Sequence, residues 1–258
     1  MIEYFKTFWK FKGLLNELVV RDIKVKYRRS ALGYVWSVLN PLLMMIVIAT
    51  VFSHMFRFDI DNYPIYLLTG QLIYNFYSDS TNLSMTSIIS SGSLIKKVHL
   101  PKYIFPLSRT LSSFVNLLFS LAAILIMLAI TRTKITPVIF LFPLPLFYVL
   151  LLCIGMGLIL SVLAVYFRDM LHLYGVFLTA LMYLTPIFYP VKQLPSYALS
   201  IIKLNPLYHI VFMFRNIVMY GTFPTLKENL ICFSFGALSI IIGLIIFSKK
   251  QDNFVLYL

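Results

Sequence analysis

Long apolar runs separated by short basic gaps are the feature that most limits what this chain can fold into. A helix that crosses the hydrocarbon core of a membrane, about 30 Å thick, needs about 20 mostly apolar residues. The sequence contains six such runs, at about residues 35–57, 63–86, 107–131, 137–165, 171–189 and 226–248. The composition agrees, because 60% of the 258 residues are hydrophobic and only 12% are charged. We therefore expect an all-α integral membrane protein with six transmembrane helices.

The segment between the fifth and sixth runs is different, because prolines divide it into apolar pieces that are too short to cross. It reads YPVKQLPSYALSIIKLNPLYHIVFMFRNIVMYG, and we expect short re-entrant or outer helices there. We find no internal repeat and no stretch typical of a soluble domain. We therefore expect one membrane domain over residues 1–258, with a cytoplasmic interfacial segment (1–34), a six-span core (35–248) and a cytoplasmic tail (249–258).

Lysine and arginine predict the orientation, because cytoplasmic loops of membrane proteins carry an excess of both. With the N-terminus inside, 15 of the 22 basic residues fall on the cytoplasmic side and seven on the outer side. We therefore expect both termini in the cytoplasm. The net charge of +13 does not predict nucleic-acid binding, since the basic residues lie between apolar runs rather than on one soluble face.

Basic residues accumulate directly before the first run, in VVRDIKVKYRRSALGYVW. Residues 2–11 place apolar and polar side chains on opposite halves of a helix, which predicts an amphipathic helix on the membrane surface. Arg28 and Arg29 follow at the mouth of the first span. Either these charges only fix topology and contact anionic headgroups, or the two guanidinium groups hold the diphosphate of a lipid-linked substrate. In the second case, Tyr34 and Trp36 lie where the linked sugar enters.

The second run carries tyrosines at helical spacing. Tyr63, Tyr66, Tyr74 and Tyr77 share one face of a helix. A tyrosine offers a sugar ring an apolar face and a hydroxyl, without the deep binding that would stall a moving polymer. We predict that this stripe lines a polysaccharide path; the alternative is that the rings only pack against a neighbouring helix. Asp79 lies on the other face, where we expect a buried basic partner.

These motifs occur in the order and spacing of a known family. The series LVVRDIKVKYRRSALGYVWSVLNPLLMMIVIATVFSHMF is followed by VYFRDM after the fourth run and by TPIFYP and LNPLYHIVFMFRN after the fifth. Essentially from end to end, the chain resembles the permease subunit of type 2 ABC exporters of polysaccharides. That family exports O-antigens, capsular polysaccharides and teichoic acids.

The resemblance implies a transporter rather than an enzyme. It implies a homodimer in the bacterial inner membrane that moves a lipid-diphosphate-linked polysaccharide, in the first place an O-antigen, through a pore at the dimer interface. Two copies of a separate ATPase subunit would bind ATP and Mg²⁺, whereas this chain would bind no cofactor and no metal. The sequence agrees in that it contains no G-x-x-x-x-G-K-[ST] phosphate loop.

The loop between the second and third spans, SGSLIKKVHLPKYIFP, is the predicted docking element for that ATPase. A short helix over residues 93–100 would expose apolar side chains for insertion into a groove, and Pro101 would end it. An ordinary basic loop is the alternative. By resemblance, the short FRDMLH loop also faces the ATPase, although a structural helix cap explains its charges equally well. The residues assigned to coupling are Leu94, Ile95, Lys97, Val98, His99, Arg168 and Asp169.

The broken helices between the fifth and sixth runs, together with the resemblance, predict an outer gate over residues 190–221. In this hypothesis Pro195, Pro206 and Arg215 close the exit of the pore when no substrate is present. A passive surface cap is the alternative.

Two other functions are considered. Asp59, Ile60 and Asp61 form a D-x-D in the first outer loop, and paired carboxylates could serve a membrane glycosyltransferase that uses a lipid-linked sugar. No second acidic or histidine cluster accompanies this motif in the sequence. An ABC-2 exporter of drugs or lipids shares the expected architecture but needs no sugar-compatible lining.

Overall fold

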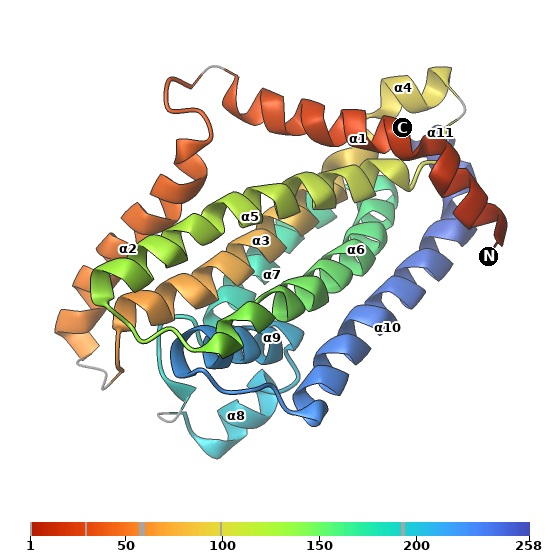
Figure 1. Cartoon of the computed structure of the whole chain (residues 1–258). Helices are drawn as coiled ribbons and strands as arrows, with labels where there is room; N and C mark the ends of the chain where they lie inside the picture. The colour runs from red at the N-terminus through yellow and green to blue at the C-terminus, as the bar shows by residue number, and fades with distance from the viewer. Residues whose placement is uncertain (1, 29, 57–59, 99, 192–193) are drawn as a thin grey trace.

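The computed structural model describes residues 2–28, 30–56, 60–98, 100–191 and 194–258, with side chains for all of these except 2–8, 27 and 53–56. Within these ranges the regular structure is entirely helical, so the all-α expectation is confirmed. The long helices run back and forth between two ends of a bundle (Figure 1). They are α2 (Val35–Phe56), α3 (Tyr63–Ser90), α5 (Ile104–Thr131), α6 (Pro143–Tyr166), α7 (Met170–Leu184) and α10 (Leu226–Lys250).

Among the described residues, four helical segments are long and apolar enough to cross a membrane: Val35–Phe52, Ile104–Thr131, Pro137–Tyr166 and Leu226–Tyr257. A fifth candidate is the pair Ser196–Ile202 and Pro206–Tyr220, which is bent by 95°. Two of the expected spans fall short by these criteria, since α3 has 28 residues but many polar side chains and α7 has only 15 residues. The structure therefore supports four to five spans by length and composition, and the count of six stays a prediction.

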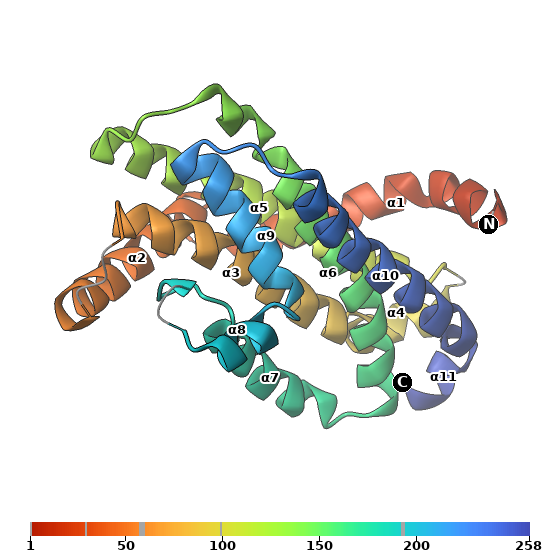
Figure 2. The ribbon, with the colours of Figure 1, turned by 90° about the horizontal axis from the view of Figure 1, so that it is seen from below.

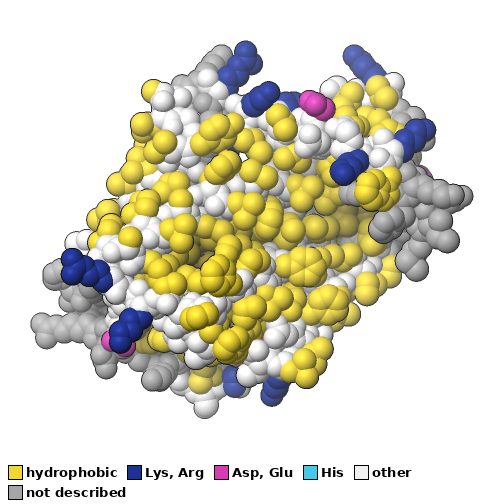
Figure 3. All heavy atoms as spheres, viewed as in Figure 1, with side chains coloured by type: hydrophobic (Ala, Val, Ile, Leu, Met, Phe, Trp, Pro, Cys, Tyr) yellow, Lys and Arg dark blue, Asp and Glu magenta, His cyan; other side chains and the backbone are white. Residues whose placement is uncertain are grey.

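One end of the bundle holds the short helices α4 and α11 and both termini (Figure 1). Helix α1 (Ile2–Tyr27) lies across this end and packs against α5, with Leu15 and Leu18 buried. Helices α4 (Gly92–Lys97) and α11 (Phe254–Tyr257) lie at the same end, which we call the α4 end. In the face shown in Figure 3, a broad apolar band separates basic side chains at the two opposite edges. This pattern is typical of a protein whose middle is immersed in lipid.

The opposite end holds the proline-broken segment. It contains α8 (Ser196–Ile202), α9 (Pro206–Arg215) and the π-helical turn Asn216–Tyr220. The short 3-10 helix Pro137–Leu141 precedes α6 and contacts the π-helical turn. Short helices between the fifth and sixth runs were expected, and the structure contains them.

Helix α3 occupies the centre, between α5 on one side and α7 on the other (Figure 2). Several hydroxyls of this polar helix donate to carbonyls of its own preceding turn, which lowers the cost of burying them. Thr69, Thr81 and Ser87 donate to the carbonyls of Ile65, Tyr77 and Ser84 at 3.0, 2.7 and 2.6 Å. Each hydroxyl is thereby satisfied without water.

Glycines allow α6 and α10 to approach each other closely. A Cβ added to Gly243 would lie 2.7 Å from the carbonyl oxygen of Gly155, so no larger residue fits there without a shift of the backbone. Cys153 and Cys232 are on these two helices, and both are buried free thiols.

Candidate functional site

The predicted docking helix is present but shorter than expected. Helix α4 ends at Lys97, and Val98 follows in extended conformation. Leu94 and Val98 are 37% and 46% exposed, and Lys97 is exposed. The prediction that Ile95 is exposed was wrong, because this side chain packs into the buried cluster beneath α4. His99 lies outside the described residues.

The C-terminal tail packs beside α4, which the sequence did not reveal. Helix α11 contacts both α4 and α6, and the ring of Phe254 is fully buried. Lys102 Nζ donates to the carbonyl oxygen of Gln251 at 2.6 Å and holds the tail in place. Leu256 and Tyr257 remain 81% and 49% exposed. We refer to Leu94, Lys97, Val98, Leu256 and Tyr257 as the α4–tail surface.

Arg168 and Asp169 lie in the turn between α6 and α7, at the α4 end, and both are exposed. Asp169 occupies the N-cap position of α7, but its side chain makes no capping hydrogen bond. The geometry therefore gives the helix-cap alternative no support, and the coupling role of the two residues stays a prediction.

The basic residues at the mouth of the first span lie apart from the buried core. Arg28 is exposed, and Arg29 lies outside the described residues. Tyr34 and Trp36 are 45% and 41% exposed, and the ring of Tyr34 lies 5.5 Å from that of Phe119 on α5. These side chains are accessible, as a role in receiving substrate requires; that role is untested.

The predicted tyrosine stripe does share one face of α3, but that face is packed. Tyr63, Tyr66, Tyr74 and Tyr77 are between 4% and 8% exposed. The hydroxyls of the first three donate to the carbonyls of residues 188, 189 and 178 at 2.8, 2.8 and 2.6 Å. In this single chain, the geometry agrees with the alternative that the tyrosine rings pack against a neighbouring helix. A polymer could touch these rings only if α7 and the segment after it moved away, so their part in transport stays a prediction.

The predicted gate residues occupy distinct places in the outer segment. Pro195 and Pro206 stand at the starts of α8 and α9, where a missing N–H costs no helical hydrogen bond. Arg215, the last residue of α9, is 4% exposed and tied into the bundle. Its guanidinium donates to the carbonyls of Pro186, Tyr66 and Ile187 at 2.6, 3.1 and 3.1 Å. It also lies 3.5 Å above the ring of Tyr66, so Arg215 joins the outer helices to the tyrosine face of α3.

A polar cleft lies on the opposite face of α3, towards the α4 end. It consists of two adjoining cavities of about 430 and 110 Å³, enclosed by the end of α1, the start of α2, α3 and α5. Both cavities are lined by Lys26, Asp79, Ser113 and Asn116. Asp79 is exposed to the cleft, and Lys26 is the basic group that interacts with it electrostatically. The expectation of a buried partner was wrong, because Lys26 is exposed as well.

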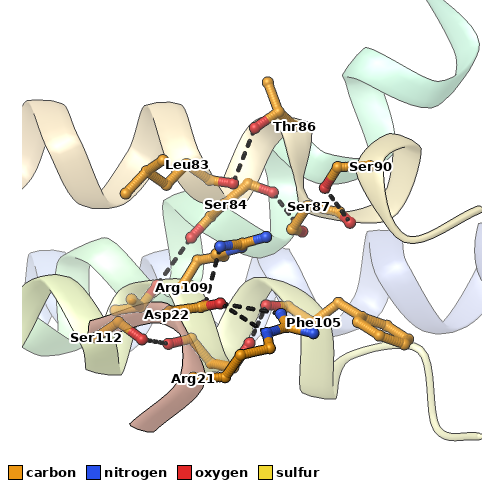
Figure 4. Close-up of polar contacts among 12 residues, drawn as sticks. Arg21, Asp22, Leu83, Ser84, Thr86, Ser87, Ser90, Phe105, Arg109 and Ser112 are labelled. Carbon is orange, nitrogen blue, oxygen red and sulfur yellow. Dashed lines mark hydrogen bonds and ion pairs between the residues drawn. The ribbon is translucent and has the colours of Figure 1, made fainter. Parts of the chain in front are cut away.

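An ion pair closes the α1 side of the cleft. Asp22 Oδ2 lies 3.0 Å from Arg109 Nη1 on α5, and Asp22 Oδ1 lies 2.9 Å from Arg21 Nη2 (Figure 4). The Asp22 side chain is 8% exposed, whereas that of Arg109 is 25% exposed. The pair therefore fixes the end of α1 to α5 at the rim of the larger cavity.

Sequence reasoning missed this cleft, although part of it was visible. Asn75, Asp79 and Asn82 recur at helical spacing opposite the tyrosines, and such polar residues are costly if they face lipid. The residues from α1 and α5 could not be assigned to the same place, because they lie far from α3 in the sequence.

The helical bundle, the apolar band and the polar cleft define the chain as a multi-spanning α-helical membrane protein. Comparison with known proteins identifies the particular family: residues 14–219 match the profile of the ABC-2 type transporters. The chain therefore belongs to this family of membrane transporters.

Similar proteins are known from several bacteria. The chain is 30% identical to a protein of Klebsiella pneumoniae named O-antigen export system permease protein RfbA, over 94% of this chain and 95% of that one. A protein of the same name from Myxococcus xanthus is 26% identical over 98% of each chain. The polysialic acid transport protein KpsM of Escherichia coli is 24% identical over 93% of this chain and 95% of that one.

Proposed function

We propose that this chain is the transmembrane subunit of an ATP-driven exporter that moves a lipid-diphosphate-linked polysaccharide, in the first place an O-antigen, across the bacterial inner membrane. The observation that carries the proposal is the similarity to permeases named for O-antigen export, which extends over nearly the whole of both chains. Weaker similarity to a polysialic acid transport protein supports the broader substrate class, an exported polysaccharide.

In this proposal the bundle crosses the membrane six times and works as a homodimer. Helices α3 and α7 are the two remaining spans in this proposal. Helix α3 has 28 residues, as many as α5, and the shorter α7 packs beside it (Figure 1). The polar side chains of α3 are sheltered by protein, which removes the cost of placing them in lipid. The α4 end, where most basic residues lie, faces the cytoplasm.

The α4–tail surface is the docking site for two copies of a separate ATPase, which binds ATP and Mg²⁺. Exposed apolar side chains beside a lysine suit a groove on a soluble partner. Arg168 and Asp169 contact the same partner from the neighbouring turn. Changing Leu94 to Asp should abolish copurification of the ATPase, whereas changing Leu226 to Asp, at the opposite end and 77% exposed, should preserve it.

On the outer side, Pro195, Pro206 and Arg215 belong to a gate formed by α8 and α9. The bend of 95° and the hydrogen bonds from Arg215 to the carbonyls of Pro186 and Ile187 support a rigid element that moves as a unit with the segment after α7. Opening of this element would uncover Tyr63, Tyr66, Tyr74 and Tyr77 for the polymer. Arg28 and Arg29 receive the lipid diphosphate beside Tyr34 and Trp36.

Deletion of this chain in its host, with its ATPase intact, tests the proposal. Lipid-linked polymer should disappear from the cell surface and accumulate inside, and a plasmid copy should restore its display. Unchanged display, with loss of drug resistance or of a lipid from the outer leaflet instead, would overturn the polysaccharide assignment in favour of a drug or lipid exporter.

A further inference from the structure

The polar cleft beside α3 has no part in the function proposed so far, although it is the largest cavity described above. Its volume of about 430 Å³ falls within the range of small-molecule sites, about 300 to 1,000 Å³. It lies towards the α4 end, where in the proposed function a substrate made in the cytoplasm would first meet the protein. Its position therefore suits an early binding step rather than release.

The lining of the larger cavity combines apolar side chains, such as Leu83 and Phe119, with charged side chains that balance one another. Asp22 and Asp79 oppose Lys26 and Arg109, which gives two acidic and two basic side chains. Asp22 is already paired with Arg109 at 3.0 Å, so an anionic ligand would have to break that pair. The side-chain amides of Asn82 and Asn116 add donors and acceptors without charge. This chemistry favours a neutral ligand that carries many hydroxyl groups.

One buried hydroxyl indicates that something polar belongs in the cleft. Ser113 lines both cavities and is 7% exposed, yet its Oγ has no hydrogen-bond partner among the described residues. An unsatisfied buried hydroxyl costs about 1 to 3 kcal/mol, so such groups usually meet a ligand or an ordered water. A ligand hydroxyl in the cleft would satisfy Ser113 Oγ.

An aromatic ring stands at the edge of the smaller cavity. Trp36, in the first turn of α2, lines it together with Asn75 of α3 and is 41% exposed. An indole face packs well against the C–H face of a sugar ring, while amides and carboxylates bond its hydroxyls. Amide, paired carboxylate and indole together are the combination that a saccharide requires.

From this geometry we infer that the cleft is a saccharide-binding site, which holds one or two sugar residues of the substrate before they enter the pore. The inference rests on the proposed function, which supplies the polysaccharide. It differs from the predicted path along the tyrosine stripe, because it uses the opposite face of α3. The same cleft could instead take the headgroup of a membrane phospholipid, and the experiment distinguishes the two.

A photocrosslinking amino acid placed at Asn82 tests the inference in living cells that express the full transporter with its ATPase. Irradiation should attach polysaccharide to this chain. On a denaturing gel the chain would then migrate as a ladder of bands that an antibody against the glycan recognises. The matched control places the same amino acid at Leu125, which is 62% exposed on α5 and outside the cleft. It should yield no ladder.

Substitution provides a second, independent readout. The double variant Asn82→Leu and Asn116→Leu removes two hydrogen-bonding side chains at the cleft, and we expect export to fall at least about tenfold, since about 1.4 kcal/mol corresponds to a factor of ten. Copurification with the ATPase should persist. Ser234→Leu, a polar-to-apolar change at an exposed site on α10, should leave export unchanged.

The outcomes separate this inference from the proposed function. Crosslinks to phospholipid without glycan, or full export by the double variant, would overturn the saccharide site while leaving polysaccharide export intact. If the unmodified chain supports no export of polymer at all, the proposed function itself fails. If the double variant is not recovered, the crosslinking result at Asn82 alone decides.

Discussion

The two faces of α3 meet the rest of the molecule in opposite ways. On one face, four tyrosines are buried, and three of their hydroxyls donate to carbonyls of α7 and the segment after it. On the other face, Asn75, Asp79 and Asn82 are exposed in a cleft beside α1, α2 and α5. We call the buried tyrosine face of α3 its closed face, and the face that carries Asn75, Asp79 and Asn82 its open face.

This difference indicates that the closed face of α3 contributes to the stability of the bundle, whereas the open face contributes to function. A buried hydroxyl that is hydrogen-bonded contributes to holding the bundle together, and its loss removes a bond between two elements. An exposed amide in a cleft has no such role in folding, so its presence in a membrane protein requires another explanation. Substitutions on the closed face should therefore change stability, and those on the open face should not.

Replacing Arg215 with Leu should have the largest effect on the closed face. The change removes three hydrogen bonds to buried carbonyls and the stacking over Tyr66, and we expect a loss of about 3 kcal/mol in the free energy of unfolding. Denaturant titration in detergent measures it. Lys227→Leu, at an exposed basic residue, is the control. If both variants lose the same free energy of unfolding, the hydrogen bonds of Arg215 do not stabilise the bundle.

Replacing Gly70 with Ala should have the next largest effect. An added Cβ would lie 2.6 Å from Arg215 Nη2 and 3.4 Å from the Cα of Ile187, so the guanidinium must shift away from its carbonyls. Such overpacking costs about 1 to 3 kcal/mol. Gly175→Ala is a matched control on α7, because nothing lies within 4 Å of its added Cβ. It should be neutral or stabilising, and a similar loss there would contradict the packing argument.

Changing Tyr74 to Phe should cost about 1 kcal/mol of stability, because it removes only the hydroxyl that donates to the carbonyl of Leu178 at 2.6 Å. The comparison variant is Tyr197→Phe, at a residue that is 73% exposed, and its thermal midpoint should not move. The two midpoints are measured side by side in the same detergent. If they coincide, the hydroxyl does not hold α7 against α3.

Changing Asn75 to Leu should have the smallest effect on stability, within about 0.5 kcal/mol, because this side chain is exposed in the cleft. The same denaturant titration used for Arg215 measures it. A loss comparable to that of Tyr74→Phe would mean that the open face also holds the bundle together. The contrast between the two faces would then disappear.

Much of the helix pattern could be predicted from the sequence. Apolar runs near 20 residues predicted most helices closely, and prolines correctly marked the short helices between the fifth and sixth runs. The prediction was poorest for the fifth run, where α7 ends at Leu184 rather than near residue 189. There Pro186 follows Thr185 directly and excludes it from helical conformation, although the residues beyond remain apolar.

The candidate sites were less predictable. Helical spacing shows which residues share one face of a helix, but it does not show which other helix packs against that face. The tyrosines were correctly placed on one face, yet only the packing of α7 shows that this face is closed. Ile95 was expected at the surface of the docking helix, and the cluster beneath α4 buries it. The partner of Asp22 is Arg109, which is 87 residues away and could not be singled out among the other basic residues.

The sequence alone determined that this protein is a helical membrane protein with basic residues at the ends of its spans. Hydropathy and charge can be read from consecutive residues, without knowledge of the tertiary structure. Only the tertiary structure decided which polar residues of α3 are satisfied and which remain open. The hydrogen-bond partners of the tyrosine hydroxyls are distant in sequence, so the closed tyrosine face and the open cleft differ only once α1, α5 and α7 are in place.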